Sequence, residues 1–253
     1  MHDDGADFTP AGDRLRWIRL GGSGPDPVVF VHGLGCHGAA SWAETARRLG
    51  RPAIVLDLPG HGRSDRPREY DYSLESLADA VAAAIRAVAP GAVDLVSHSL
   101  GGTIAIVLAA RHPDLVRRSV LVEPGIDRRE IAPGDIAAFT DEELLGDGWG
   151  VLLERETASR RAEIRLTDPI ALRRCAVSIT DALGGTVGDL LASAAVPTTL
   201  VRGGARSYDD GARFARAGVT ERVLGRAGHF VMLDEPDAFV ELLDEAFGTT
   251  PRA

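Results

Sequence analysis

The feature that most constrains the fold is a repeated switch between two kinds of segment along the chain. Short runs of consecutive apolar residues predict strands buried on both faces, as in a parallel sheet. Segments with helical spacing of apolar residues separate them, and this alternation predicts a mostly parallel, doubly wound α/β sheet. The predicted strands cover residues 14–20, 27–32, 53–58, 93–97, 119–123, 198–203 and 221–225.

Helix start signals follow several of these runs. Ser41 can cap a helix that runs to about Leu49, and Ser73 can cap a longer helix whose apolar residues keep a helical spacing. A helix rich in small residues is predicted over 100–112, directly after a strand. The last helix is expected from near Pro236 to near Phe247.

One long segment interrupts the alternation. Residues 125–192 are charged and mostly helical in pattern, and they contain no run typical of a buried strand. A stretch of roughly 65 residues is too long for a simple connection between two strands. We therefore predict a core formed by residues 1–124 and 193–253, with 125–192 inserted as a helical cap.

Composition excludes several classes of protein. The chain is 45% hydrophobic and 26% charged, which is typical of a globular protein. Lys and Arg number 28 against 37 Asp and Glu, a net charge of −9 that argues against a nucleic-acid partner. The acidic start of the chain does not resemble a signal peptide, and no apolar stretch is long enough for a membrane span. We therefore expect a cytoplasmic protein with no membrane partner, while its oligomeric state stays open.

The sequence also lacks the patterns of common cofactor sites. Two cysteines, Cys36 and Cys175, are too few for a disulfide scaffold and lack zinc-site spacing. The glycine-rich residues 21–27 lead into a strand rather than a helix, unlike a phosphate-binding loop. We therefore predict neither a cofactor nor a metal.

The strongest local signal is the sequence VSHSLGG at residues 96–102, where a predicted strand meets a predicted helix. Ser99 lies between two small residues, Ser97 and Gly101, two positions before and after it. Small neighbours are required where the chain turns sharply and projects a serine hydroxyl above the sheet. The following helix start places backbone N–H groups where negative charge would develop.

Three further motifs follow predicted strands in the same order along the chain. They are HGLG at 32–35, DLPGHGRS at 57–64 and AGHF at 227–230. Together with the sharp turn, these motifs resemble those of the α/β-hydrolase superfamily, with Ser97 replacing the first glycine of the usual turn. The resemblance covers about 28–123 and 196–247 and implies that family's fold and a serine nucleophile.

The chemistry then suggests a role for each residue. A serine hydroxyl needs a base to take its proton, and His229 is the candidate for that base beside the nucleophile Ser99. The oxyanion would be held by the backbone N–H groups of Leu34 and Leu100. His32 is expected to brace the loop of Leu34, and His98 to support the packing.

The acid of the catalytic triad is less clearly marked. A histidine base needs a carboxylate to fix its tautomer, and most of the superfamily carries it after the strand corresponding to 198–203. Arg206 to Tyr208 are not acidic there, and Asp209 and Asp210 come slightly late. Glu123 ends a buried run, at a position similar to the catalytic glutamate of haloalkane dehalogenases. Because burying an unpaired carboxylate is costly, we predict Glu123 as the acid. Asp209 or Asp210 is the alternative, and a structural salt bridge is another explanation for Glu123.

The sequence therefore predicts a serine hydrolase that cleaves an ester, lactone or thioester of a small to medium apolar molecule through an acyl-enzyme. A small-molecule substrate would enter between cap and sheet. The same site would also suit an acyltransferase, a C–C bond hydrolase or a biosynthetic cyclase. A non-catalytic protein of this fold that binds a ligand is the third alternative.

Overall fold

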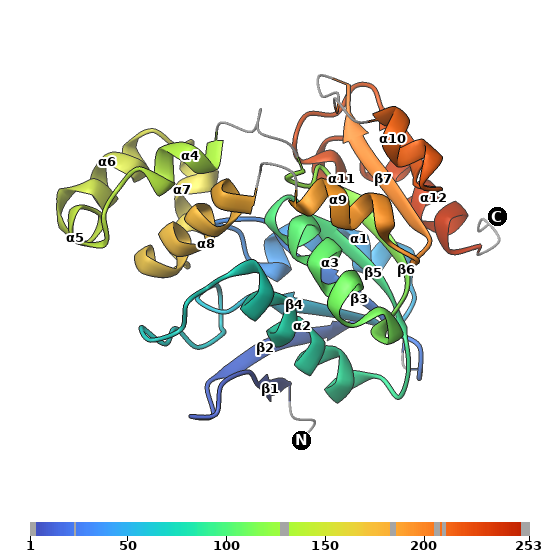
Figure 1. The fold of residues 1–253 in the computed structure, drawn as a ribbon, viewed down its shortest axis with the longest axis horizontal. Helices are drawn as coiled ribbons and strands as arrows, with labels where there is room; N and C mark the ends of the chain where they lie inside the picture. The colour runs from blue at the N-terminus through green and yellow to red at the C-terminus, as the bar shows by residue number, and fades with distance from the viewer. Residues whose placement is uncertain are drawn as a thin grey trace.

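The computed structural model describes residues 4–22, 24–126, 132–182, 186–204, 208 and 211–248. Its centre is an eight-stranded sheet in the order β1-β2-β4-β3-β5-β6-β7-β8 (Figure 1). The strands are β1 (Gly5–Asp7), β2 (Arg14–Leu20), β3 (Val28–Val31), β4 (Ala53–Asp57), β5 (Val93–His98), β6 (Val116–Val122), β7 (Thr198–Gly203) and β8 (Thr220–Leu224).

The sheet confirms the predicted α/β class. Strands β4, β3, β5, β6, β7 and β8 pair in parallel, whereas β2 is antiparallel to both β1 and β4. Every residue of β3, β4 and β5 is buried, including the polar residues Asp57, Asp94, Ser97 and His98. The carboxyl ends of these central strands therefore meet at one edge, where ligands of open α/β sheets bind.

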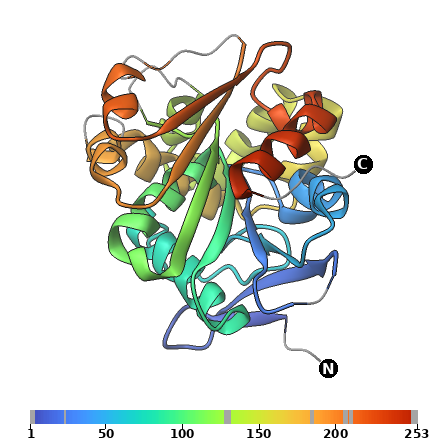
Figure 2. The ribbon, with the colours of Figure 1, turned by 90° about the vertical axis from the view of Figure 1, so that its right-hand side faces the viewer.

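Helices cover both faces of the sheet, and Figure 2 shows the two sets on opposite sides. One set shares a core with Val28, Phe30 and Trp42, and the other shares a core with Val29, Val31 and neighbouring residues. The first set is α1 (Gly38–Leu49), α11 (Val231–Asp234) and α12 (Pro236–Phe247), and the second is α2 (Leu74–Val88), α3 (Leu100–Arg111) and α9 (Thr186–Ser193). A short 3-10 helix, Pro113–Leu115, precedes β6, and α10 (Gly211–Arg216) precedes β8.

The start of α1 corrects the sequence prediction. The helix begins at Gly38, with His37 rather than Ser41 at its N-cap. The Gly38 N–H donates to Oδ1 of the buried Asp57 at 2.8 Å, so a carboxylate from β4 takes the place of a local cap. A Cβ at Gly38 would lie 2.4 Å from the Leu56 carbonyl oxygen, which explains why glycine occupies this position. The cap predicted at Ser73 is confirmed, since its hydroxyl accepts the Ser76 N–H at 3.1 Å.

The segment between β6 and β7 is helical, as its sequence predicts. Its helices before α9 stand together at one end of the sheet, whereas α9 lies beside α3 (Figure 1). Leu152, Leu153, Ile164 and Leu172 form a small hydrophobic cluster within the first group. The division of the chain into core and cap stays a prediction. The elements are α4 (Ala132–Ala137), α5 (Asp141–Glu143), η2 (Leu144–Gly148), α6 (Trp149–Glu154), α7 (Ala158–Ile164) and α8 (Pro169–Ala182).

Within the described residues, no single helix is both long and apolar enough to cross a bilayer. By length and composition alone, α8 and α9 pass that test as a pair, but they are bent by 67° from each other.

Candidate active site

The chain turns sharply at Ser99, between β5 and α3. Ser99 has φ 52° and ψ −119°, in a region that side-chain-bearing residues rarely adopt. Its neighbours must be small, because a Cβ at Gly101 would lie 2.6 Å from the His32 carbonyl oxygen. A Cβ at Gly102 would lie 2.8 Å from the Cβ of Pro124. The turn thus has the geometry that the sequence predicts for a nucleophile elbow.

A second turn, Gly33–Cys36, follows β3 and lies against the elbow. The Cys36 N–H donates to the Gly33 carbonyl at 3.2 Å, and Gly35 has φ 64°, which makes this a type II turn. A Cβ placed on Gly33 would lie 3.1 Å from the Cβ of Ser99. In the described part of the chain, the N–H groups of Leu34 and Leu100 donate to no acceptor. Both are therefore available to a developing oxyanion.

Two buried histidines support this turn from the sheet side. His32 Nε2 accepts the Leu58 N–H at 3.0 Å, so its proton is on Nδ1, which donates to the Gly33 carbonyl at 2.8 Å. Burial lowers the pKa of His32 to about 4, which keeps the ring neutral. His61 Nε2 accepts the Gly35 N–H at 3.4 Å, and burial lowers the pKa of His61 to about 3. The bracing role predicted for His32 thus has a specific hydrogen bond behind it.

The predicted acid and base meet at the ends of two strands. Glu123 follows β6, is 3% exposed, and accepts the Gly203 N–H through Oε1 at 2.7 Å. Its Oε2 lies 3.4 Å from Nδ1 of His229, which follows β8 in a short loop. The side chain of His229 is 43% exposed, so the ring is partly accessible.

His98 links this pair to the elbow. It directly precedes Ser99 and is 1% exposed. Its Nε2 donates to the backbone carbonyl of His229 at 2.9 Å, and the two ring centroids are 4.6 Å apart. Burial, followed by the effect of His229, holds the pKa of His98 well below its ordinary value, so the ring stays neutral. The sequence predicted only packing support here, whereas the structure adds a bond that locates the His229 backbone.

The structure brings some predicted residues together and leaves others apart. Glu123 and His229 are within hydrogen-bond range, and Gly33 places the turn of Leu34 against Ser99. Among the described residues, no hydrogen bond joins the Ser99 hydroxyl to the His229 ring. Such contacts are often long before substrate binds. The alternative acids, Asp209 and Asp210, lie outside the described residues.

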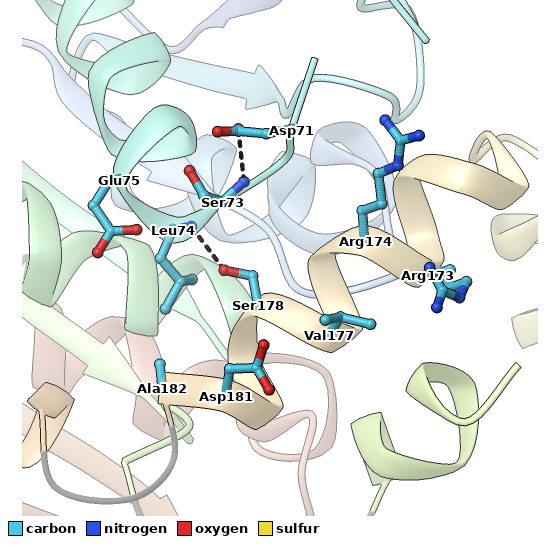
Figure 3. Close-up of a pocket in the computed structure, with 10 residues that line it drawn as sticks. All are labelled: Asp71, Ser73, Leu74, Glu75, Arg173, Arg174, Val177, Ser178, Asp181 and Ala182. Carbon is cyan, nitrogen blue, oxygen red and sulfur yellow. Dashed lines mark hydrogen bonds between the residues drawn. The ribbon is translucent and has the colours of Figure 1, made fainter. Parts of the chain in front are cut away.

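A separate cavity of about 380 Å³ lies between the start of α2 and α8 (Figure 3). The Ser178 hydroxyl accepts the Leu74 N–H there at 2.9 Å, and Asp71 Oδ1 accepts the Ser73 N–H at 3.0 Å. None of the predicted site residues lines this cavity, so we assign it no part in the chemistry.

Sequence reasoning missed Arg160 of α7, whose guanidinium reaches the turn that carries Leu34. Nothing nearby marks it, because several arginines occupy the same helical segment. A contact between residues more than 120 positions apart leaves no local pattern in one sequence.

Comparison with known proteins shows the family of this chain. A model of the alpha/beta hydrolase family matches residues 28–242. An esterase of Mycobacterium tuberculosis H37Rv is 33% identical over 262 residues, covering 90% of this chain and 84% of the esterase. The chain therefore belongs to the alpha/beta hydrolase family, which confirms the resemblance seen in its motifs.

Solved structures add two likenesses. An N-acyl homoserine lactone degrading enzyme, Est816, is 26% identical with a TM-score of 0.72, covering 95% of this chain and 99% of the enzyme. An esterase from Thermogutta terrifontis has a TM-score of 0.78 at 21% identity, covering 96% of this chain and 97% of the esterase. The second likeness is one of fold.

Proposed function

We propose that this protein is a serine hydrolase that cleaves an ester, lactone or thioester of a small to medium apolar molecule through an acyl-enzyme. The observation that carries the proposal is the buried Glu123 carboxylate, 3.4 Å from the His229 ring and beside the Ser99 turn. Related esterases and a lactone-degrading enzyme of similar structure support ester hydrolysis as the reaction class.

In the first half-reaction, Ser99 Oγ attacks the acyl carbonyl carbon while His229 Nε2 takes the hydroxyl proton. Glu123 would keep the His229 proton on Nδ1, which leaves Nε2 free to act as the base. The carbonyl oxygen becomes an oxyanion and accepts hydrogen bonds from the N–H groups of Leu34 and Leu100. The leaving alcohol or thiol then takes the proton from His229, and the acyl group remains on Ser99.

In the second half-reaction, His229 takes a proton from a water molecule, which attacks the acyl carbonyl carbon. The bond to Ser99 Oγ then breaks, Oγ takes the proton back from His229, and the acid is released. These steps use only side chains and backbone groups of the chain, so we propose no cofactor. A serine nucleophile also disfavours dehalogenation and epoxide opening, although Glu123 occupies a dehalogenase-like position. Those reactions use an alkyl-enzyme ester formed by a carboxylate nucleophile.

Labelling with a fluorophosphonate probe tests the proposal directly. We expect rapid labelling of the wild type at Ser99, none of Ser99→Ala, and much slower labelling of His229→Ala. Hydrolysis of a neutral p-nitrophenyl ester, measured on the same samples, should be lost in parallel. Folded wild-type protein that neither labels nor hydrolyses esters would contradict the proposal and favour a ligand-binding protein.

A further inference from the structure

Arg160 connects a helix of the segment between β6 and β7 to the turn beside the elbow. Its Nη2 donates to the Leu34 carbonyl at 3.4 Å, and its Nη1 donates to the Gly35 carbonyl at 3.5 Å. Nη1 also lies 3.1 Å from the Cys36 sulfur, and the Arg160 side chain is only 23% exposed. One guanidinium therefore contacts three successive residues of the turn, using the fork of donors that arginine presents.

The turn needs such a support because its central peptide can rotate. Type I and type II turns differ by a half-turn of the peptide between their two central residues, here Leu34 and Gly35. Glycine at position 35 makes both orientations accessible. Arg160 binds the carbonyl of this peptide, and His61 binds its N–H from the other side. Together they hold one of the two orientations. The Leu34 N–H belongs to the preceding peptide, and it is linked to this one through the Leu34 Cα that the two peptides share.

Apolar contacts from the same helical segment cover the turn. The Leu34 side chain packs against the cluster that contains Ile164 and Leu172. A Cβ on Gly35 would lie 3.1 Å from Ile164 and 3.2 Å from Leu172. Residues of α7 and α8 thus close over the turn, and Arg160 adds directional bonds to that packing.

The surroundings of Arg160 fit a holding role. Burial raises the pKa of the Cys36 thiol, so Cys36 is a neutral neighbour rather than a reactive thiolate. Glu163 Oε2, 3.1 Å from Nη1, balances the charge of Arg160. The guanidinium carbon also lies 5.4 Å from the ring centre of Phe230, the residue after His229. Arg160 therefore contacts both the turn of Leu34 and the loop of the base.

We propose that Arg160 is a positioning residue that fixes the turn carrying the Leu34 N–H, so that the packing of α7 against this turn affects how well the oxyanion of the transition state is bound. This inference rests on the proposed function. It predicts that losing Arg160 impairs catalysis after the substrate has bound, because the turn that carries the Leu34 N–H is then held less tightly.

The test compares Arg160→Met with wild type on a neutral p-nitrophenyl ester. Removing one oxyanion donor lowers kcat by about 10²–10³-fold, so loosening one should lower it by about 10–100-fold. We expect KM to change less than about twofold and the affinity for a trifluoromethyl ketone to fall with kcat/KM. Arg165→Met, which removes an exposed arginine from the end of the same helix, is the matched control and should keep wild-type kcat.

Further variants separate positioning from simple stabilisation. Arg160→Lys keeps the charge but not the fork, and we expect it to recover part of the lost kcat. Glu163→Gln breaks only the ion pair, and a loss equal to that of Arg160→Met would assign the effect to that pair and overturn the proposal. If Arg160→Met does not fold, Arg160→Lys carries the test, and wild-type kcat in that variant overturns it.

The outcomes distinguish this inference from the proposed function. If the wild type labels at Ser99 and hydrolyses esters, while Arg160→Met has unchanged kcat per labelled site, only the Arg160 inference fails. A loss confined to KM, or seen only with anionic esters, would indicate substrate binding by Arg160 and would also overturn it. If the wild type fails to label, both proposals fail.

Discussion

The turns at Ser99 and at Glu123, which follow neighbouring strands, share two backbone features. Both residues have left-handed φ values, 52° and 49°. Each donates its backbone N–H to a carbonyl of the next strand, Val122 for Ser99 and Val201 for Glu123, at 2.9 Å. Thr103 of α3 joins the two turns, since its hydroxyl binds both the N–H and the carbonyl of Gly125.

The two turns differ in what they do with the side chain. After Ser99 the chain enters α3, and the serine hydroxyl makes no hydrogen bond to another described residue. After Glu123 the chain continues into a loop, and the buried carboxylate binds the Gly203 N–H and faces His229. We therefore propose that one turn presents the nucleophile, whereas the other fixes the acid that orients the base.

The largest expected effect comes from replacing Ser99. Ser99→Ala should lower kcat for an activated ester by about 10⁴-fold or more, because the residual rate comes only from binding and the oxyanion hole. Steady-state kinetics with the p-nitrophenyl ester measures this. Unchanged activity in the variant would show that another group is the nucleophile and would remove the contrast between the turns.

Replacing Glu123 should also lower the rate strongly, but less than replacing Ser99. Glu123→Gln keeps an oxygen for the Gly203 N–H but turns an amide toward His229, which favours the wrong imidazole tautomer. We expect kcat to fall by about 10²–10⁴-fold with little change in KM.

Asp209→Asn and Asp210→Asn are the matched controls for Glu123→Gln. We expect each to retain kcat within about threefold, since the proposal assigns the role of the acid to Glu123 and not to either aspartate. A severe loss in either control, with normal activity in Glu123→Gln, would assign the role of the acid to that aspartate instead of Glu123.

The same contrast explains what sequence could predict. The elbow can be predicted from the sequence because its requirements are local: small residues two positions from Ser99, a strand before it and a helix after it. Glu123 stands out as a candidate in the sequence because an acid at the end of a buried run has a high desolvation cost. The sequence does not predict that Asp57 caps α1 or that Arg160 contacts the turn at Leu34. Each of these side chains binds a residue far away in sequence. Their partners are fixed by the packing of strands and helices.

His98 provides a finer test, because it bonds the His229 backbone from the residue before the nucleophile. Gln can place an N–H donor near the position of Nε2, whereas Asn is too short to reach it. We therefore expect His98→Gln to keep kcat within about threefold and His98→Asn to lose about tenfold, which corresponds to about 1.4 kcal/mol.

The pH dependence of kcat/KM should have the same form in both His98 variants as in the wild type, because the native His98 ring stays neutral. Equal rates for Gln and Asn would mean that this bond does not position the base.

The last prediction concerns stability rather than rate, and it tests His32 and His61, which support the turn at Leu34. The folded-state pKa values of His32 and His61 are lowered by burial from an ordinary 6.5 to about 4 and about 3. Above pH 6.5 the two histidines are neutral in both the folded and the unfolded chain, so their protonation does not lower the free energy of unfolding. Below it the unfolded chain binds protons that the folded chain excludes, so the free energy of unfolding falls by at most about 1.4 kcal/mol per pH unit for each histidine.

Protonation of carboxylates lowers the free energy of unfolding at lower pH than protonation of these histidines does. Arg117 and Arg51 hold the pKa of Asp94 below its ordinary 3.8 against the opposing effect of burial, so that stabilisation is lost only below about pH 4. Urea unfolding between pH 6.5 and 4.5 therefore reports mainly on the histidines. We expect His61→Gln to show a shallower decline than wild type over this range, whatever its stability at pH 7. Equal slopes would mean that His61 is not held neutral in the folded protein, so its support of the turn at Leu34 would need another explanation.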